Sequence, residues 1–262
     1  ERRTGGVPTP AVALVTFAVA MVLAFYASLL VEKRGLLAAL LVVQYGFFLL
    51  PALAVVFGFG YSARDTLRLR MPAPVHLPAA LVIGASAWVA IVGVFMRIAP
   101  PPDSLTRGLE QLLTLGDPGL PVWVVLLGVG ITPAVCEELF FRGVVLSGLM
   151  RLGAWPAVLL SALLFGLAHA SIYRMLPTLA LGIVLAWLAW QTGSILPSMT
   201  VHAMNNGLIA WLARHPQAGR LLGIDETSSL PPIAVTLAAA AACAAGLWIG
   251  WKTARQDQPL HT

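Results

Sequence analysis

Long apolar stretches recur along the whole chain, and they constrain its fold more than any other feature. Each is close to the roughly 20 residues that an α-helix needs to cross the hydrocarbon core of a bilayer. Of the 262 residues, 59% are hydrophobic and only 10% are charged, whereas about a quarter are charged in soluble domains. We therefore predict an all-α polytopic membrane protein of about eight transmembrane helices around an intramembrane polar cavity. The predicted spans are Ala11 to Val31, Leu36 to Phe59, Leu77 to Met96, Leu120 to Val135, Ala154 to Ala170, Leu176 to Trp190, Ile195 to Leu212 and Pro232 to Trp251.

The positive charge of the chain is spread between these spans. The formal net charge is +5, but the 16 Lys and Arg residues form no run longer than two. This distribution is typical of anchors near phospholipid headgroups and gives no indication of nucleic-acid binding. The charged start of the chain leads into the first span without a small-residue cleavage site, so we expect a retained helix and not a signal peptide. We expect one transmembrane domain over residues 1–262, in the lipid bilayer of a bacterial inner membrane.

The fourth span continues into a cluster of charged residues, where we expect a long helix or a break near Pro133. Ionisable residues inside a span cost roughly 2.5–3.5 kcal/mol each on insertion scales and therefore mark functional candidates. Successive residues on a helix lie about 100° apart, whereas residues four apart share a face. We predict that Arg142 neutralises Glu138, while Glu137 faces a polar cavity as a base or a metal ligand. The alternative is a buried charged cluster that only fixes helix packing.

Two further segments place polar residues in apolar spans. His169 stands four residues after Phe165 at the end of one span, and histidine is suited to proton transfer near neutral pH. His202 and Asn206 share one helical face, and both side chains can donate the hydrogen bonds that an oxyanion site requires. The alternatives are a histidine that serves packing, and interhelical hydrogen bonds worth about 1 kcal/mol or less.

These residues together also fit a metal site. One carboxylate and two histidines form a known catalytic zinc set, here Glu137, His169 and His202. A serine or cysteine hydrolase fits poorly, because Ser161 lies two turns before His169. Cys136, among apolar and acidic neighbours, would be poorly ionised.

The three segments carry sequence motifs in a fixed order. They read Glu-Glu-x-x-x-Arg at 137–142, Phe-x-x-x-His at 165–169 and His-x-x-x-Asn at 202–206. This set resembles the family of CAAX proteases and bacteriocin-processing enzymes, also called the Abi family, which includes the type II CAAX prenyl endopeptidases. The resemblance covers a motif-bearing core of about residues 120–212. The other spans match only in being apolar.

The resemblance implies an intramembrane endopeptidase that hydrolyses a peptide bond near the C-terminus or in a membrane segment of a protein or peptide substrate. It implies that Glu137 and His169 activate the hydrolytic water. The other implied roles are oxyanion stabilisation by His202 and Asn206 and structural support by Glu138 and Arg142.

Two questions remain open at this point. Relatives have been described as metalloproteases and as metal-free glutamate-dependent enzymes. We favour the mechanism without a cofactor, because a glutamate and a histidine suffice to deprotonate water, and zinc is the alternative. A non-catalytic scaffold or a transporter that uses the same polar residues for packing or proton relay is the competing function.

Overall fold

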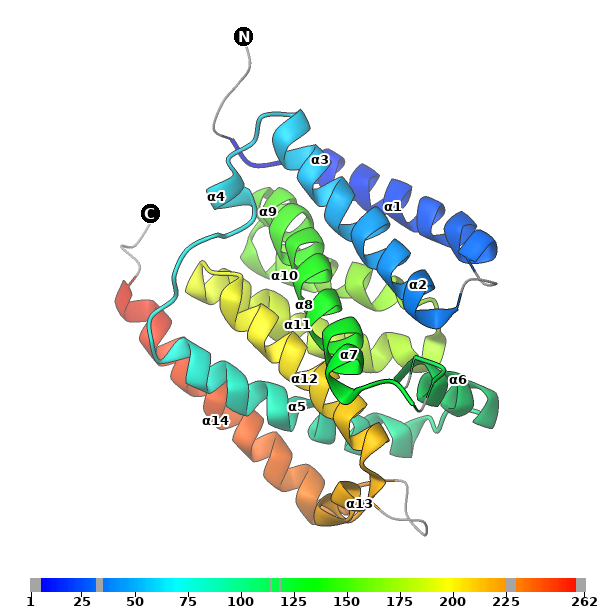
Figure 1. Cartoon of the computed structure of the whole chain (residues 1–262). Coiled ribbons are helices and arrows are strands. Elements are labelled where there is room, and N and C mark those ends of the chain that lie inside the picture. The colour runs from blue at the N-terminus through cyan, green and yellow to red at the C-terminus, as the bar shows by residue number, and fades with distance from the viewer. Residues whose placement is uncertain (1–5, 32–34, 114, 118, 225–229, 258–262) are drawn as a thin grey trace.

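The computed structural model describes residues 6–31, 35–113, 115–117, 119–224 and 230–257, and all regular structure in these ranges is helical. Figure 1 shows the helices gathered in one bundle around a central run of helical turns. The long elements are α1 (Pro10–Val31), the run α2 (Leu36–Leu41), η2 (Val42–Leu49) and α3 (Leu50–Gly58), α5 (His76–Ile98), α10 (Ala154–Leu167), α11 (Ile172–Thr192), α12 (Leu196–Arg214) and α14 (Ile233–Asp257). Short elements in the connections are α4 (Ala63–Thr66), α6 (Asp103–Leu113), α13 (Pro216–Gly219) and η6 (Arg220–Leu222).

The central run contains most of the charged motif. It consists of α7 (Val122–Val125), η3 (Leu126–Ile131), α8 (Thr132–Glu138), η4 (Leu139–Val145), α9 (Leu146–Leu149) and η5 (Met150–Leu152). Its helical turns continue past Pro133, which comes just after the wider π-helical turns of η3. Of the two expectations for this region, the long helix is correct. Two of its segments, η3 and η4, are wider π-helical turns, which are frequent at functional sites.

Six helices in the described part of the chain are long and apolar enough to cross a membrane. They correspond to the predicted spans one to four, six and eight. Helix α10 has only 14 residues, and α12 contains His202, Asn205 and Asn206, which lower its mean hydropathy. A helix is present at each of the eight predicted windows, but the count of eight membrane crossings and the polar cavity remain predictions.

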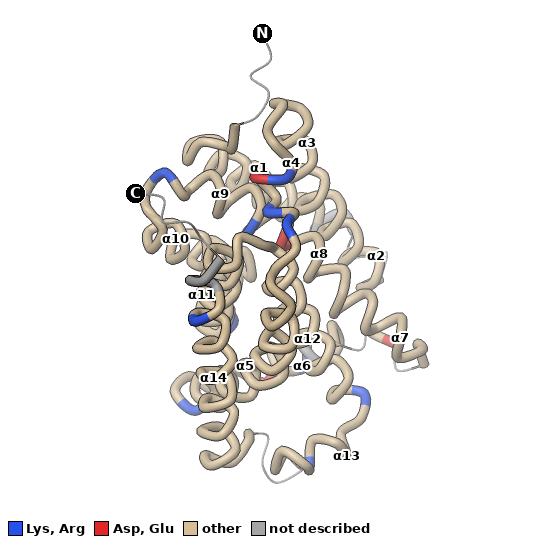
Figure 2. Tube along the Cα trace, turned by 90° about the vertical axis from the view of Figure 1, so that its left-hand side faces the viewer, with Lys and Arg blue, Asp and Glu red and all other residues tan. Residues whose placement is uncertain are grey.

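Charged residues lie mostly toward the two ends of the bundle, as Figure 2 shows. Between the ends, α5 packs against α14 and α12, and α11 packs against α10 and α12. Helix α12 also contacts α8 and η3 of the central run. The residues of the second and third motifs are thereby brought next to the first.

Close packing of α10 and α11 depends on a small residue. A Cβ added to Gly182 of α11 would lie 3.1 Å from the Cα of Ala162 in α10 and 3.2 Å from its carbonyl oxygen. Small residues allow helix backbones in membranes to approach in this way. The position of α11 matters for the site described below, because it supplies a carbonyl oxygen to the buried arginine.

We expect Gly182→Ala to destabilise the protein by about 1–3 kcal/mol, because the added methyl group forces α10 and α11 apart. Thermal unfolding of the purified protein in detergent measures this loss. Gly46→Ala is the matched control, since a Cβ added there meets nothing within 4 Å. Equal stability of the two variants would contradict the packing argument.

Candidate active site

A buried ion pair lies at the centre of the site. Arg142 Nη1 donates a hydrogen bond of 2.6 Å to Glu138 Oε1, and both side chains are fully buried. Arg142 Nη2 donates to the carbonyl oxygen of Gly182 in α11 at 3.2 Å. The guanidinium also stacks over Phe165 of α10, 4.4 Å from the ring centroid, in a cation–π contact. The pair that the four-residue spacing predicts is present, and it connects η4 with two neighbouring helices.

His202 lies between the two glutamates. Its Nδ1 is 2.9 Å from Glu138 Oε1, and its Nε2 is 3.9 Å from Glu137 Oε2. Because an ionised carboxylate only accepts hydrogen bonds, Nδ1 carries the hydrogen that Glu138 receives. The carboxylate that belongs to the ion pair therefore also orients the imidazole, with Nε2 directed toward the other glutamate.

Glu137 has a hydrogen-bond partner that the sequence motifs do not include. Gln44 Nε2, in η2, donates to Glu137 Oε1 at 2.7 Å, although the two residues are 93 positions apart. Both side chains are buried, Glu137 with 8% exposure and Gln44 with 3%. The only sequence signal for this contact was a single carboxamide inside an apolar window. The contact itself depends on how η2 packs against α8, which the sequence does not specify.

His169 follows the short helix α10. Its Nδ1 lies 2.9 Å from the carbonyl oxygen of Phe165, so Nδ1 donates and Nε2 of the neutral ring is an acceptor. The Phe165 ring contacts both histidines, with centroid distances of 5.0 Å to His169 and 5.7 Å to His202. Phe165 thus separates the two imidazoles and at the same time covers Arg142. The 14 residues of α10 span only about 21 Å, less than the roughly 30 Å of a hydrocarbon core.

Asn206 lies one helical turn after His202. Its Oδ1 accepts a hydrogen bond of 3.1 Å from Asn205 Nδ2, and its Nδ2 donates to the carbonyl oxygen of Val129 at 3.4 Å. The Val129 carbonyl belongs to the π-helical segment η3. The amide group is therefore held between α12 and the central run, with a long hydrogen bond on its donor side.

Arg68, in the connection between α4 and α5, packs over the end of the site. Its Nε donates to the carbonyl oxygen of Arg142 at 3.2 Å, and its own carbonyl oxygen accepts from the backbone N–H of Ile195 at 3.1 Å, just before α12. Burial lowers the pKa of the Arg68 guanidinium to about 10, so it stays charged at neutral pH. Arg68 belongs to none of the three motifs, so its contact with the site was not predicted from the sequence.

The described residues include the ligand set predicted for zinc, Glu137, His169 and His202. Among all described residues, no three His, Cys, Asp or Glu side chains are grouped closely enough to hold an ion. In the predicted ligand set, Glu137 Oε1 already accepts from Gln44, and His202 Nδ1 faces Glu138. These contacts leave Glu137 Oε2 and His202 Nε2 as the atoms that could face an ion, so the choice between zinc and a mechanism without a cofactor remains a prediction.

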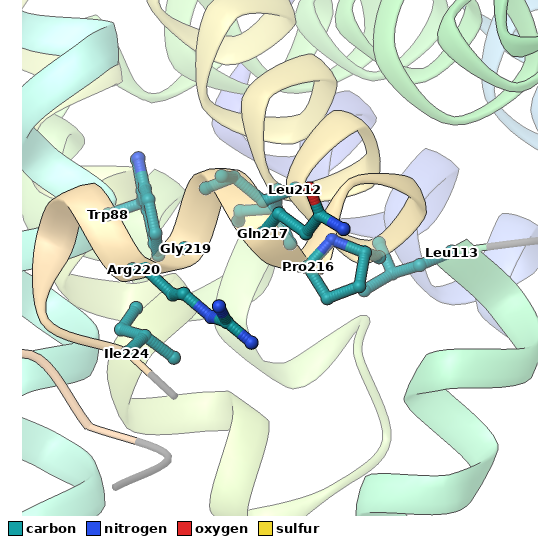
Figure 3. A pocket seen from close by; sticks show the side chains of 10 residues that line it. Trp88, Leu113, Leu212, Pro216, Gln217, Gly219, Arg220 and Ile224 are labelled. Atoms are coloured by element: carbon teal, nitrogen blue, oxygen red, sulfur yellow. The ribbon is translucent and has the colours of Figure 1, made fainter. Parts of the chain in front are cut away.

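A large pocket lies at a distance from these residues along α12. It has a volume of about 630 Å³ and is mainly apolar, with Arg220 and Gln217 among its lining residues. Figure 3 shows it between the end of α12, α13 and the side chains of Trp88 and Leu113. None of the seven motif residues lines it, so the pocket is separate from the site.

We expect Arg142→Ala to lower stability by about 3–5 kcal/mol, because it leaves Glu138 as an unpaired buried charge. The amount of folded protein in the membrane and its thermal unfolding in detergent measure this effect. Arg151→Ala, at an exposed position in η5, is the matched control and should change stability by less than about 0.5 kcal/mol. A folded Arg142→Ala protein of normal stability would show that the ion pair is dispensable.

Comparison with known proteins agrees with the motif resemblance. Residues 119–208, about a third of the chain, match the family model described as type II CAAX prenyl endopeptidase Rce1-like. No curated protein and no solved structure matches the chain. The matched segment contains all seven motif residues, so the match supports the same family that the motifs resemble.

Proposed function

We propose that this protein is a glutamate-dependent intramembrane endopeptidase. The observation that carries the proposal is the arrangement of Glu137, which has one carboxylate oxygen held by Gln44 and the other 3.9 Å from His202 Nε2. One oxygen is fixed, and the second is directed toward a group that can share in the reaction. The match to the type II CAAX prenyl endopeptidase Rce1-like model supports peptide-bond hydrolysis as that reaction.

Water activation is assigned to Glu137 and His169. The Glu137 carboxylate accepts a proton from water, and the Nε2 lone pair of neutral His169 is the second acceptor available to orient that water. The hydroxide formed adds to the carbonyl carbon of the scissile peptide bond. The proton on Glu137 is then delivered to the amide nitrogen as the C–N bond breaks, which returns the carboxylate to its starting state.

The negative charge on the oxygen of the tetrahedral intermediate must be stabilised by hydrogen-bond donors. His202 Nε2 and Asn206 Nδ2 are assigned this role, since both belong to one face of α12. Because Nδ1 already donates to Glu138, Nε2 can donate only when the ring is doubly protonated. Two carboxylates and one guanidinium surround this ring, so an imidazolium would make the buried cluster of Glu137, Glu138, Arg142 and His202 electrically neutral.

The substrate proposed is a protein or peptide with a scissile bond in a membrane segment or near its C-terminus. The reacting groups lie among apolar helices, so a substrate must approach from within the bilayer or from its surface. We place the enzyme in a bacterial cytoplasmic membrane.

The proposal predicts that Glu137→Gln, His169→Ala and His202→Ala each abolish cleavage while the protein remains folded in the membrane. The variants are expressed in the native host, and membrane and secreted proteins are compared for a product made by the wild type. His215→Ala is the matched control for His202→Ala, because His215 lies exposed at the far end of α12, stacked on Trp211. It should cleave as the wild type does.

The same comparison is made with and without a metal chelator. A product that disappears in the three site variants and persists with chelator supports the glutamate mechanism. A product that chelator removes would require a metal-loaded arrangement that differs from the one described. Identical protein patterns in all strains would contradict the protease and favour a scaffold or a transporter.

A further inference from the structure

Gln44 is a buried polar residue that the motifs do not include and to which the proposed reaction assigns no step of its own. It lies in η2, a π-helical segment whose two buried residues are Gln44 and Phe48. Segment η2 packs against α8, which carries Glu137. Gln44 is also outside the segment 119–208 that matches the family model, so its contact with the site comes from a part of the chain that the match does not cover.

The orientation of the Gln44 carboxamide is determined by its partner. Because a carboxylate only accepts hydrogen bonds, the NH₂ group and not the oxygen must face Glu137. The donor to acceptor distance is 2.7 Å, at the short end for such a bond and typical of one with an ionised acceptor. The geometry therefore indicates a charge-assisted hydrogen bond to one specific oxygen of Glu137.

Packing alone is a poor explanation for this residue. The Oε1 of Gln44 is buried and has no hydrogen-bond partner among the described residues, which is unfavourable inside an apolar bundle. An apolar side chain of the same length would fill the space without that cost. Within the described part of the chain, the Gln44 side chain has one hydrogen bond in return, and its acceptor is the proposed base.

We propose that Gln44 is a positioning residue for the reaction, acting through Glu137. By holding Oε1, it leaves Oε2 as the oxygen that faces His202 Nε2 and takes the proton from water. This inference rests on the proposed function, since it assigns Gln44 a part in the same reaction. It also adds a fourth segment of the chain to a site that the motifs place on three.

The kinetic test uses Gln44→Met, which keeps the length of the side chain and removes the donor. The probe is the membrane protein whose cleavage is lost in Glu137→Gln, mixed with the full-length purified enzyme. We expect kcat to fall about ten- to hundredfold, the usual range for losing a hydrogen bond to a charged group, and KM to stay unchanged. Phe48→Leu, on the same face of η2, is the control for lost packing and should retain the wild-type kcat.

A second measurement needs no substrate. The infrared difference between the wild type and Glu137→Gln isolates the carboxylate stretching bands of Glu137. The same difference taken in the Gln44→Met background should show those bands shifted, because one oxygen has lost its donor. If Gln44→Met fails to fold, Gln44→Asn replaces it in both measurements, since it keeps an amide but is shorter by one methylene.

The outcomes separate this inference from the proposed function. Shifted carboxylate bands with a lower kcat support it, and folded variants with unshifted bands or a wild-type kcat overturn it while leaving the protease intact. If the wild type cleaves nothing, the assignment to catalysis fails together with the proposed function. The infrared bands then still decide whether Gln44 binds Glu137.

Discussion

The ion pair between Glu138 and Arg142 is the interaction on which the arrangement of the site depends. Two charges in an apolar bundle are tolerated only when each is paired and hydrogen-bonded. Their additional contacts specify the neighbours: Arg142 reaches Gly182 of α11 and covers Phe165 of α10, and Glu138 reaches His202 of α12. The pair therefore contacts three helices around the central run. We infer that its main effect is to specify the register of these helices, since a buried ion pair adds little net free energy to folding.

Contacts within one helix were predictable, and contacts between helices were not. The pairing of Glu138 with Arg142 follows from a spacing of four residues, which is a local property. The approach of His202 to Glu138 depends on how α12 is rotated and shifted against α8, and no local pattern fixes that. The contact of Gln44 with Glu137 joins residues 93 positions apart, so it appears only when two spans are packed together.

The π-helical turns were also not predictable from the sequence. Three π-helical segments, η2, η3 and η4, each supply one group to the site: the Gln44 amide, the Val129 carbonyl and the Arg142 side chain. An extra residue in a turn rotates all following side chains by about 100° relative to those before it. Helical periodicity counted along these spans therefore gives the wrong face beyond each such turn, although the spans themselves are still recognised from their hydropathy.

The two adjacent glutamates differ in how their carboxylate oxygens are bound. Glu138 is fully buried and bound to a guanidinium and an imidazole, as expected for a carboxylate that holds a structure together. Glu137 is bound firmly through Oε1 only, while Oε2 lies 3.9 Å from His202 Nε2, beyond hydrogen-bonding distance. This asymmetry suits the proposed general base, because the oxygen without a hydrogen-bond partner among the described residues can accept a proton.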